Sequence, residues 1–309
     1  MPTSAELMPL VTLHTDVTGF LHYLRADKGS SPLTVATYEN DLRLWLEHMA
    51  VKYPELLAWP KITPQAIRSW VMAMSRGGGI APATINRRLS ALRSLFRYLR
   101  LCGLAEHDPL RSIKSLKKPK QLPKYLKERE MHKLIDEVEY GEDYEGQLER
   151  AIIVTLCHTG IRRGELLGLR LADVDWAQQQ LRVLGKRNKV RLVPFGDEMA
   201  QVLRAMLACN EEGLRPLDMP LFVQLDGKPL TTGRLAKIVR KRIGEVSTIA
   251  KRTPHVLRHT YATAMLNNNA ALENVKELLG HESVATTQVY THTTIDELKK
   301  AYRSAHPRA

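Results

Sequence analysis

Two short motifs carry basic and imidazole side chains at spacings that suit an anion. The stretch Thr253-Pro254-His255-Val256-Leu257-Arg258 opens with a capping residue and a proline, which is typical of a helix start. His255 and Arg258 then lie one turn apart, so both can point at one anion near the helix N-terminus. Upstream, Glu165 follows Arg162 by one turn. Taken alone, the first motif is more typical of a capped surface helix, and Arg162 of a structural ion pair.

Two further reactive side chains follow a predicted helix end. An apolar helical stripe stops at Gly280, a natural C-terminal residue for a helix. His281 comes next in the chain, and Tyr290 lies farther on, beyond a second short helix that Ser283 can cap. The imidazole and the phenol are therefore expected outside the long helices.

A basic β-hairpin is predicted between the runs Leu181–Leu184 and Val190–Pro194, which are rich in β-prone residues. Three basic residues occupy its tip: Lys186, Arg187 and Lys189. Such a tip can contact a phosphate backbone, although a lone basic hairpin is more often a solvated turn. The run Leu221–Gln224 is a further candidate strand.

Several enzyme classes are excluded by missing motifs. The chain has no GxxxxGK[ST] nucleotide-binding loop and no GxSxG nucleophile elbow. His281-Glu282 begins like a zinc-binding HExxH motif, but Ala285 stands where the second histidine is needed. No carboxylate cluster suits two-metal nuclease chemistry. A nucleic-acid enzyme of this sequence is expected to act without a metal or a nucleotide cofactor.

Charge and composition favour a polyanionic partner. The 309 residues include 46 Lys and Arg against 33 Asp and Glu, a net charge of +13 and a pI near 9.7. The apolar runs are too short to span a membrane, and the N-terminus does not resemble a signal peptide. The 3 cysteines are an odd number without a CxxC pair, which suits a reducing cytoplasm. Nucleic acid is therefore the expected partner.

The N-terminal part is predicted to be helical. Apolar spacing and proline starts indicate helices over Pro32–Ala50, Ile62–Ser75 and Ala83–Leu101. The last of these carries three arginines on one side: Arg93, Arg97 and Arg100. This face suits a DNA major groove, and an ordinary surface helix is an equally good interpretation. From Arg111 to Glu130 basic residues dominate and two prolines interrupt any helix, which indicates a basic linker.

Together these motifs resemble the tyrosine recombinase, or phage integrase, family of site-specific DNA recombinases. The resemblance rests on six residues in a fixed order: Arg162, Lys186, His255, Arg258, His281 and Tyr290. TGIRRGELLGL, LGKRNKVRLVPF, TPHVLRHTYATAML and LLGHESVATTQVYTH each look like the family's motifs. SPLTVATYENDL and TINRRLSALRSLFRYL are similar to its core-binding domain. The resemblance covers nearly the whole chain and is strongest to the Xer subgroup, which resolves chromosome dimers.

The resemblance implies a fold as well as a function. It predicts a mainly α-helical protein with a small antiparallel β-sheet in its C-terminal domain, built as a two-domain DNA clamp. The expected parts are a helical, SAM-like core-binding domain over residues 1–110, a basic linker over 111–123 and a catalytic domain over 124–309. A helix capped by Thr294 is expected to end the chain. In relatives this helix docks on the neighbouring subunit; packing on its own domain is the alternative.

The resemblance also implies a role for each of the six residues. Tyr290 is the expected nucleophile, which forms an O-(3′-phospho-DNA)-tyrosine intermediate. Arg162 and Arg258 are expected to hold the non-bridging phosphate oxygens. The other three handle protons and hydrogen bonds: His255 assists proton transfer, His281 donates a hydrogen bond to the phosphate, and Lys186 protonates the leaving 5′-oxygen.

Other basic residues are expected to contact DNA without taking part in the chemistry. They lie on the N-terminal helix, the linker and the hairpin tip: Arg87, Arg88, Arg93, Arg97, Lys117, Lys118, Arg187 and Lys189. The implied partners are a double-stranded recombination site, a homo- or heterotetramer with a second Xer-type recombinase, and a septal DNA translocase. No metal, cofactor or membrane is expected, and the implied location is the cytoplasm, at the nucleoid.

Three alternatives stay open at this point. The integrase of a mobile element uses the same six residues and chemistry. A non-catalytic DNA-binding regulator accounts for the charge but not for the reactive residues. An enzyme that only relaxes supercoils, like the related type IB topoisomerases, needs no partner duplex. The target DNA sequence does not follow from the chain, because base readout depends on geometry and DNA shape.

Overall fold

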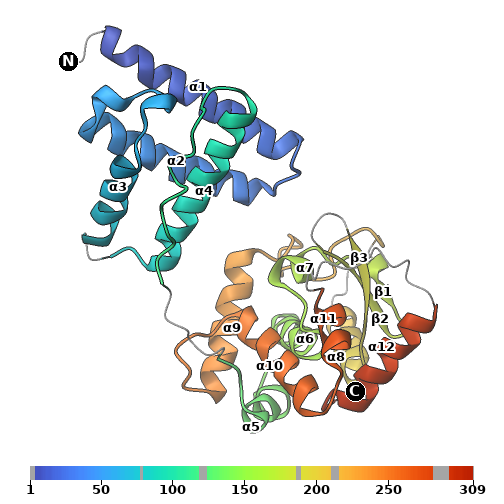
Figure 1. Ribbon diagram of the computed structural model, residues 1–309. Coiled ribbons are helices and arrows are strands. Elements are labelled where there is room, and N and C mark those ends of the chain that lie inside the picture. Colours follow the sequence, from blue (N-terminus) through green and yellow to red (C-terminus); the bar gives the residue numbers. More distant parts are fainter. Residues whose placement is uncertain are drawn as a thin grey trace. The chain divides into compact units, whose positions relative to one another are not determined.

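The computed structural model describes residues 4–76, 79–117, 124–185, 189–209, 216–280 and 292–308, with side chains described from residue 13 and, in the last helix, from residue 297. The chain divides into two compact units, Met1–Gln121 and Leu122–Ala309 (Figure 1). Within the described residues, no helix combines the length and the apolar character that crossing a bilayer requires. The domain limits expected from the sequence stay a prediction.

The described residues of the first unit form helices and connecting segments. These residues contain four α-helices and two short 3₁₀ turns: α1 Ser4–Ala26, α2 Pro32–Lys52, η1 Pro54–Leu56, η2 Trp59–Lys61, α3 Pro64–Arg76 and α4 Pro82–Leu101. The three helices predicted from apolar spacing are confirmed. Two hydroxyl groups cap helix starts, because Ser31 accepts from the backbone N–H of Thr34 and Thr63 from that of Ala66, both at 3.2 Å.

Large aromatic side chains fill the core of this unit. Trp45, Phe20 and Phe96 are all but fully buried, and the rings of Trp45 and Trp70 meet edge to face with 5.1 Å between their centroids. These rings come from different helices. Burial of their apolar surface therefore fixes the positions of α1, α2, α3 and α4 within the unit.

The second unit surrounds one buried helix. Its elements follow in chain order: α5 Glu128–His132, the π-helical turn η3 Lys133–Glu137, α6 Tyr144–Thr159, α7 Arg163–Leu167, η4 Leu171–Asp173, β1 Val174–Asp175, β2 Gln180–Leu184, β3 Val190–Pro194, α8 Asp197–Ala208, α9 Thr232–Val246, α10 Pro254–Asn267, α11 Leu272–Leu279 and α12 His292–Ala305. Every residue of α6 from Ala151 to Thr159 is buried, since the helix packs against α8, α9 and α10. A helix that is covered on all sides has an apolar sequence, and α6 does.

A small antiparallel sheet completes the unit, in the strand order β1-β2-β3. The predicted hairpin is confirmed, with Leu181 opposite Val193 and Val183 opposite Arg191. Together with the helices, this sheet confirms the predicted fold class. The candidate strand Leu221–Gln224 is wrong, because this stretch holds a single isolated bridge, from Val223 to Pro229, and a second bridge joins Arg170 to Pro220 just before it. Prolines 220 and 229 take part in those bridges, and a proline has no N–H with which to extend a ladder.

The last helix packs on its own chain and starts earlier than expected. α12 contacts α10, α11 and β3 (Figure 1), and Leu298, Tyr302 and Ala305 are buried there. It begins at His292, so Thr294 lies inside the helix and the predicted cap at that residue is wrong. The short helix expected after Ser283 lies outside the described residues.

The chain ends in a network of ion pairs. Arg308 donates two hydrogen bonds of 2.6 Å to the carboxylate of Asp136 and one of 2.6 Å to Glu198. His306 is buried, and its ring stacks on Tyr302 at 4.8 Å. The C-terminus is therefore tied to α8 and to the segment η3.

The three cysteines are free thiols in different surroundings. Cys157 is buried in α6, whereas Cys102 and Cys209 are exposed at the ends of α4 and α8. Burial raises the pKa of the Cys157 thiol to about 12. Cys157 is therefore an unreactive core residue.

Candidate active site

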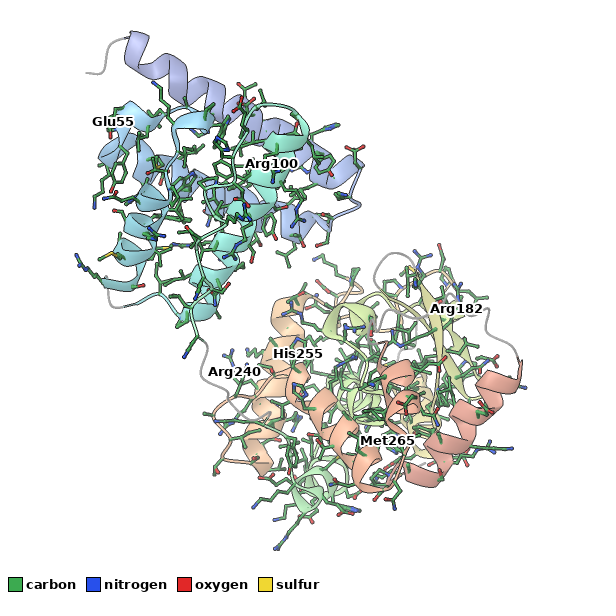
Figure 2. All side chains as sticks on the ribbon, viewed as in Figure 1. Glu55, Arg100, Arg182, Arg240, His255 and Met265 are labelled. Atoms are coloured by element: carbon green, nitrogen blue, oxygen red, sulfur yellow. The ribbon has the colours of Figure 1, made fainter. Side chains whose placement is uncertain are left out.

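Helix α10 carries two of the predicted site residues at its start. His255 is exposed in its first turn (Figure 2), and Arg258 lies one turn farther on with only 7% of its surface exposed. Pro254 occupies the first turn as expected. Thr253 is the N-cap residue, as predicted, and has an extended conformation, but its hydroxyl makes no capping bond. Instead the backbone carbonyl of Thr253 accepts from the N–H of Val256 at 2.8 Å.

The buried guanidinium of Arg258 binds two backbone carbonyls from distant segments. Its Nη1 donates to Gly160 at 2.8 Å and its Nη2 to Leu279 at 2.7 Å. Burial and the positive charge of Arg162 lower its pKa to about 10, so the group stays charged at neutral pH. Since a guanidinium has five N–H donors, these two bonds do not exhaust it.

Arg162 stands at the start of α7, next to the end of α6. Its Nη1 donates to Oε1 of Glu165 and its backbone N–H to Oε2, both at 2.8 Å. Its Nη2 donates to the carbonyl of Gly280 at 2.7 Å. Its side chain remains 30% exposed, so it can also reach a ligand. The structural ion pair considered for Arg162 is present, and it involves the residue one turn downstream.

Three arginines converge on consecutive carbonyls at the end of α11. We call them the arginine cluster: Arg162, Arg191 and Arg258. Arg191 Nε donates to Leu278 at 2.9 Å, Arg258 to Leu279 and Arg162 to Gly280. These carbonyls are the unsatisfied, negative end of the helix, and Gly280 ends it in the left-handed conformation with φ 63°. Segments far apart in sequence are thereby joined at one backbone turn.

The electrostatics of the cluster favour an anion. Glu165 is the carboxylate that pairs with it, and bonds to Arg162 and Arg191 saturate its oxygens. Burial alone raises the pKa of Glu165, but hydrogen bonds and charge from Arg191 and Arg162 outweigh burial and hold the pKa at about 2. Three guanidinium groups around one ionised carboxylate leave an excess of positive charge. Such a site binds phosphate well.

The His255 ring is tuned toward its neutral form. Partial desolvation and the positive charge of Arg258, with smaller effects from neighbours such as Arg163, lower the pKa of His255 from its ordinary value of 6.5. A neutral imidazole can accept a proton near neutral pH. The same positive field that would attract a phosphate thus favours the neutral form of His255.

The structure describes three of the six predicted catalytic residues and brings them together on neighbouring elements: Arg162, His255 and Arg258. The other three lie outside the described residues: Lys186, His281 and Tyr290. Their described chain neighbours do border the cluster. A Cβ atom added at Gly280 would lie 3.0 Å from Nη1 of Arg191, and one at Gly185 would lie 3.6 Å from the same atom.

Sequence reasoning missed Arg191 as a member of the site. It is 5% exposed and points to the same side of β3 as the buried Val193. A period-2 strand pattern places residues 191 and 193 on one face. A charged residue at the apolar phase of a predicted strand was therefore the signal that identifies it.

The predicted DNA-contacting arginines of α4 mostly have partners within their own unit. Arg87 and Arg88 pair with the buried carboxylate of Asp41, the latter at 3.6 Å. Arg93 donates to the carbonyl of Ile113 at 2.6 Å, whereas Arg97 is exposed. Of the remaining residues, Lys117 and Lys189 are exposed, and Lys118 and Arg187 lie outside the described residues. Their contacts with DNA stay predictions.

No other described feature competes with the arginine cluster as a catalytic site. Among the described residues, no three His, Cys, Asp or Glu side chains come together as metal ligands. A hollow of about 410 Å³ lies between α12 and the loop before β2, lined by residues such as Gln179, Asp197 and Lys299. None of the cluster arginines lines it.

Comparison with protein families and curated proteins gives consistent matches over the whole length. The phage integrase family matches residues 124–297, and the N-terminal SAM-like domain of phage integrases matches residues 17–103. The tyrosine recombinase XerC of Pelotomaculum thermopropionicum is 37% identical over 96% of this chain and 99% of that protein. The tyrosine recombinase XerC of Halalkalibacterium halodurans is 34% identical over 95% and 97%.

Solved structures share the fold. The XerH site-specific recombinase bound to palindromic difH substrate, in a post-cleavage complex, has a TM-score of 0.70 at 23% identity, covering 92% of this chain and 83% of that one. The Tn1549 transposon integrase in complex with transposon right end DNA has a TM-score of 0.71 at 18% identity, covering 92% and 98%.

Proposed function

This chain belongs to the phage integrase family of tyrosine recombinases, which cut and rejoin DNA, and we propose that it resolves chromosome dimers at a specific recombination site. The observation that carries the proposed chemistry is the arginine cluster. Arg162 and Arg258 bind adjacent carbonyls at the end of α11, directly before the segment that contains His281 and Tyr290. Two groups suited to bind phosphate, next in the chain to the expected nucleophile segment, support the proposal.

The two arginines hold the scissile phosphate in this mechanism. Each presents a planar set of donors to a non-bridging oxygen and stabilises the extra charge of the pentavalent transition state. Their own positions are fixed beforehand by Glu165 and by backbone carbonyls. Removing such a preorganised donor typically costs about 100-fold or more in rate.

Tyr290 attacks the phosphorus in line and displaces the 5′-oxygen of the next nucleotide. The bond from phosphorus to the phenolic oxygen forms as the bond to the 5′-oxygen breaks, which leaves a 3′-phosphotyrosyl link and a 5′-hydroxyl. A phenol has a pKa near ~10, so the tyrosine needs both a base and nearby positive charge. The neutral imidazole of His255 accepts the phenolic proton.

The remaining two residues complete the proton balance. Lys186, at the hairpin tip, gives a proton to the leaving 5′-oxygen, because an ammonium releases a proton more readily than a guanidinium does. His281 donates a hydrogen bond to a phosphate oxygen. Rejoining reverses these steps, with a 5′-hydroxyl of the partner duplex as the attacking group. The covalent link conserves the energy of the broken bond, so no nucleotide is consumed.

The biological assignment rests on relatives that are 33–37% identical to this chain. Three such proteins, matched over 95–96% of this chain, are tyrosine recombinases named XerC. The transposon integrase shares the fold at 18% identity, which does not favour a mobile-element role. We therefore propose a tetramer on DNA, homomeric or with a second Xer-type recombinase, directed by a septal translocase at the nucleoid. Residues 1–110 and the linker 111–123 grip the duplex, with affinity that falls steeply with salt.

The proposed chemistry is tested with a nicked duplex that carries a chromosomal resolution site. Cleavage beside the nick releases a short fragment that cannot religate, so the protein is trapped on the DNA. We expect a covalent adduct without added metal or ATP, measured as a band shift on a denaturing gel. Tyr290→Phe should bind the duplex but form no adduct. An adduct with Tyr290→Phe would assign the nucleophile to another residue.

A further inference from the structure

We propose that Arg191, which the expected catalytic set does not include, is a positioning residue for DNA cleavage. It acts by fixing Arg162 through Glu165, and it also donates to the Leu278 carbonyl near the end of α11. The inference rests on the proposed function, since it assigns a role within that reaction.

Arg191 uses all three nitrogens of its guanidinium. Nη1 and Nη2 donate to the two oxygens of Glu165 at 3.0 and 2.8 Å, and Nε donates to the Leu278 carbonyl at 2.9 Å. In this bidentate pairing, two parallel N–H···O bonds fix the orientation of the guanidinium relative to the carboxylate. Because both partners are buried, with 5% and 8% of their surfaces exposed, no solvent competes for these bonds.

Glu165 transmits this geometry to Arg162. Oε1 accepts from Nη1 of Arg162 and from Arg191, while Oε2 accepts from the backbone N–H of Arg162 and from Arg191. These four bonds fill the acceptor capacity of a carboxylate, so the Glu165 side chain has one orientation. Without Arg191 the carboxylate keeps only the bonds from Arg162 and can turn together with it.

Arg191 also touches the backbone beside two other expected catalytic residues. Gly280 and Gly185 both approach its Nη1 so closely that an added Cβ would lie at 3.0 and 3.6 Å. Gly280 directly precedes His281, and Gly185 directly precedes Lys186. A shift of this guanidinium would therefore disturb the backbone at Gly280, and Gly185 lies within van der Waals reach of the same group.

Stability alone does not account for an arginine here. A buried ion pair contributes little over apolar side chains of the same size, because the charges lose their hydration. Arg191 also brings a third positive charge close to Arg162 and Arg258, and its charge helps to lower the pKa of Arg258. A non-polar residue of the same size cannot make the hydrogen bonds that Arg191 makes to Glu165 and Leu278.

The matched control is a second buried ion pair in the same unit. Arg242 Nε donates to Glu149 at 2.6 Å, and both residues are buried. Among the described residues, Arg242 contacts Glu149, the carbonyl of Glu139, Glu245 and the ring of Tyr140, none of which belongs to the arginine cluster. Arg242→Met thus loses a comparable pair and lowers stability without touching the site.

The experiment compares Arg191→Met, Arg191→Lys and Arg242→Met in the full-length protein. Thermal unfolding sets a temperature at which each variant is folded. Duplex affinity and the single-turnover rate of adduct formation on the nicked duplex are then measured. We expect roughly 10- to 100-fold slower cleavage for Arg191→Met, with affinity within about 3-fold of wild type. Arg191→Lys should show a smaller loss, and Arg242→Met should cleave within about 3-fold of wild type.

A double-mutant cycle separates positioning from a general loss of structure. If Arg191 acts through Arg162, the combined Arg191→Met and Arg162→Lys variant should cleave about as slowly as Arg162→Lys alone. The proposal would be overturned if the loss of cleavage rate in the double variant equalled the product of the two single losses. It would also be overturned if Arg191→Met cleaved as fast as Arg242→Met. Should Arg191→Met not fold, Arg191→Lys carries the same cycle. Failure of wild type to form the adduct would instead refute the proposed function.

Discussion

The guanidinium of Arg258 does two things at once in this structure. It binds the carbonyls of Gly160 and Leu279, and it lies beside Arg162 with its charge intact. The same side chain therefore joins α6 to α11 and, in the proposed mechanism, supplies a phosphate-binding charge. Its replacement should affect both stability and cleavage, and the two effects can be measured separately.

For Arg258→Ala we expect the free energy of unfolding to fall by about 1–3 kcal/mol, because two buried carbonyls lose their donor. Cleavage of the nicked duplex should slow by about 100-fold or more. Urea unfolding and single-turnover cleavage at a temperature where the variant is folded provide both values. Arg162→Ala, whose side chain is more exposed, should lose cleavage to a similar degree with less destabilisation. Normal cleavage by either variant would contradict the phosphate-binding role.

The lowered pKa of His255 predicts the pH dependence of cleavage. Its neutral form is the proton acceptor, and a lowered pKa keeps that form dominant below the ordinary value of 6.5. The cleavage rate should therefore stay level from neutral pH downward and fall only below about pH 6.5. Rates measured between pH 5 and 8 test this, and His255→Gln should remove the acidic decline. A decline centred above pH 6.5 would contradict it.

At the scale of elements, the end of α11 is the point where the site is assembled. Gly280 ends the helix with φ 63°, and its backbone lies against Arg191. A side chain here meets two obstacles, a strained backbone conformation and a buried guanidinium. Gly227 offers a matched comparison in the same unit, because its φ is 74° but nothing lies within 4 Å of an added Cβ.

Gly280→Ala should therefore lower the free energy of unfolding by roughly 1–2 kcal/mol and slow cleavage by about 10-fold. Gly227→Ala should show only the backbone strain, about 1 kcal/mol, with cleavage unchanged. Urea unfolding and adduct formation by the two variants side by side measure the difference. Equal cleavage by both would show that the turn at residue 280 does not position the reaction.

The sequence predicted the helices and the hairpin more accurately than the residues at which helices begin. Apolar spacing and proline starts located α2, α3 and α4, and β-prone runs located the hairpin. Thr253 is the N-cap residue of α10, as predicted, although its hydroxyl makes no capping bond. The cap predicted at Thr294 was wrong, because α12 begins at His292. The two-residue strand β1 has too short a pattern to be seen.

The site shows the same division between local and long-range information. Spacing placed His255 and Arg258 on one helix face, and the family resemblance placed Arg162 with them. Neither showed that three arginines bind consecutive carbonyls of α11, since those contacts join residues that are far apart in sequence. Such pairings are set by the packing of the second unit, which no local pattern encodes.

At the scale of the whole molecule, ion pairs of Arg308 connect the segment after α12 to α8 and η3 of the second unit. Arg308 joins Asp136 and Glu198 beside the buried end of α12. Burial raises the pKa of Glu198, but hydrogen bonds from His158 and Arg308 outweigh it and hold the pKa at about 2; bonds from Arg308 also lower the pKa of Asp136. Carboxyl groups with lowered pKa values stabilise the fold at neutral pH and lose that contribution as the pH falls toward 2.

Arg308→Ala should lower the free energy of unfolding by about 1–2 kcal/mol at pH 7, and the deficit relative to wild type should shrink as the pH falls below about 5. Urea unfolding at pH 7 and at pH 3 measures both quantities. Arg303→Ala, which replaces an exposed arginine of α12, should leave stability nearly unchanged. A deficit that does not change with pH would place the effect outside these ion pairs.

The distribution of thiols makes the native chain ready for fluorescence spectroscopy. Cys102 and Cys209 are exposed, one in each compact unit, while Cys157 is buried and its raised pKa suppresses the reactive thiolate. A maleimide donor and acceptor dye will therefore attach to one residue of each unit without any mutation. Energy transfer between the dyes then reports how the units rearrange when a duplex is added, in molecules whose catalytic residues are untouched.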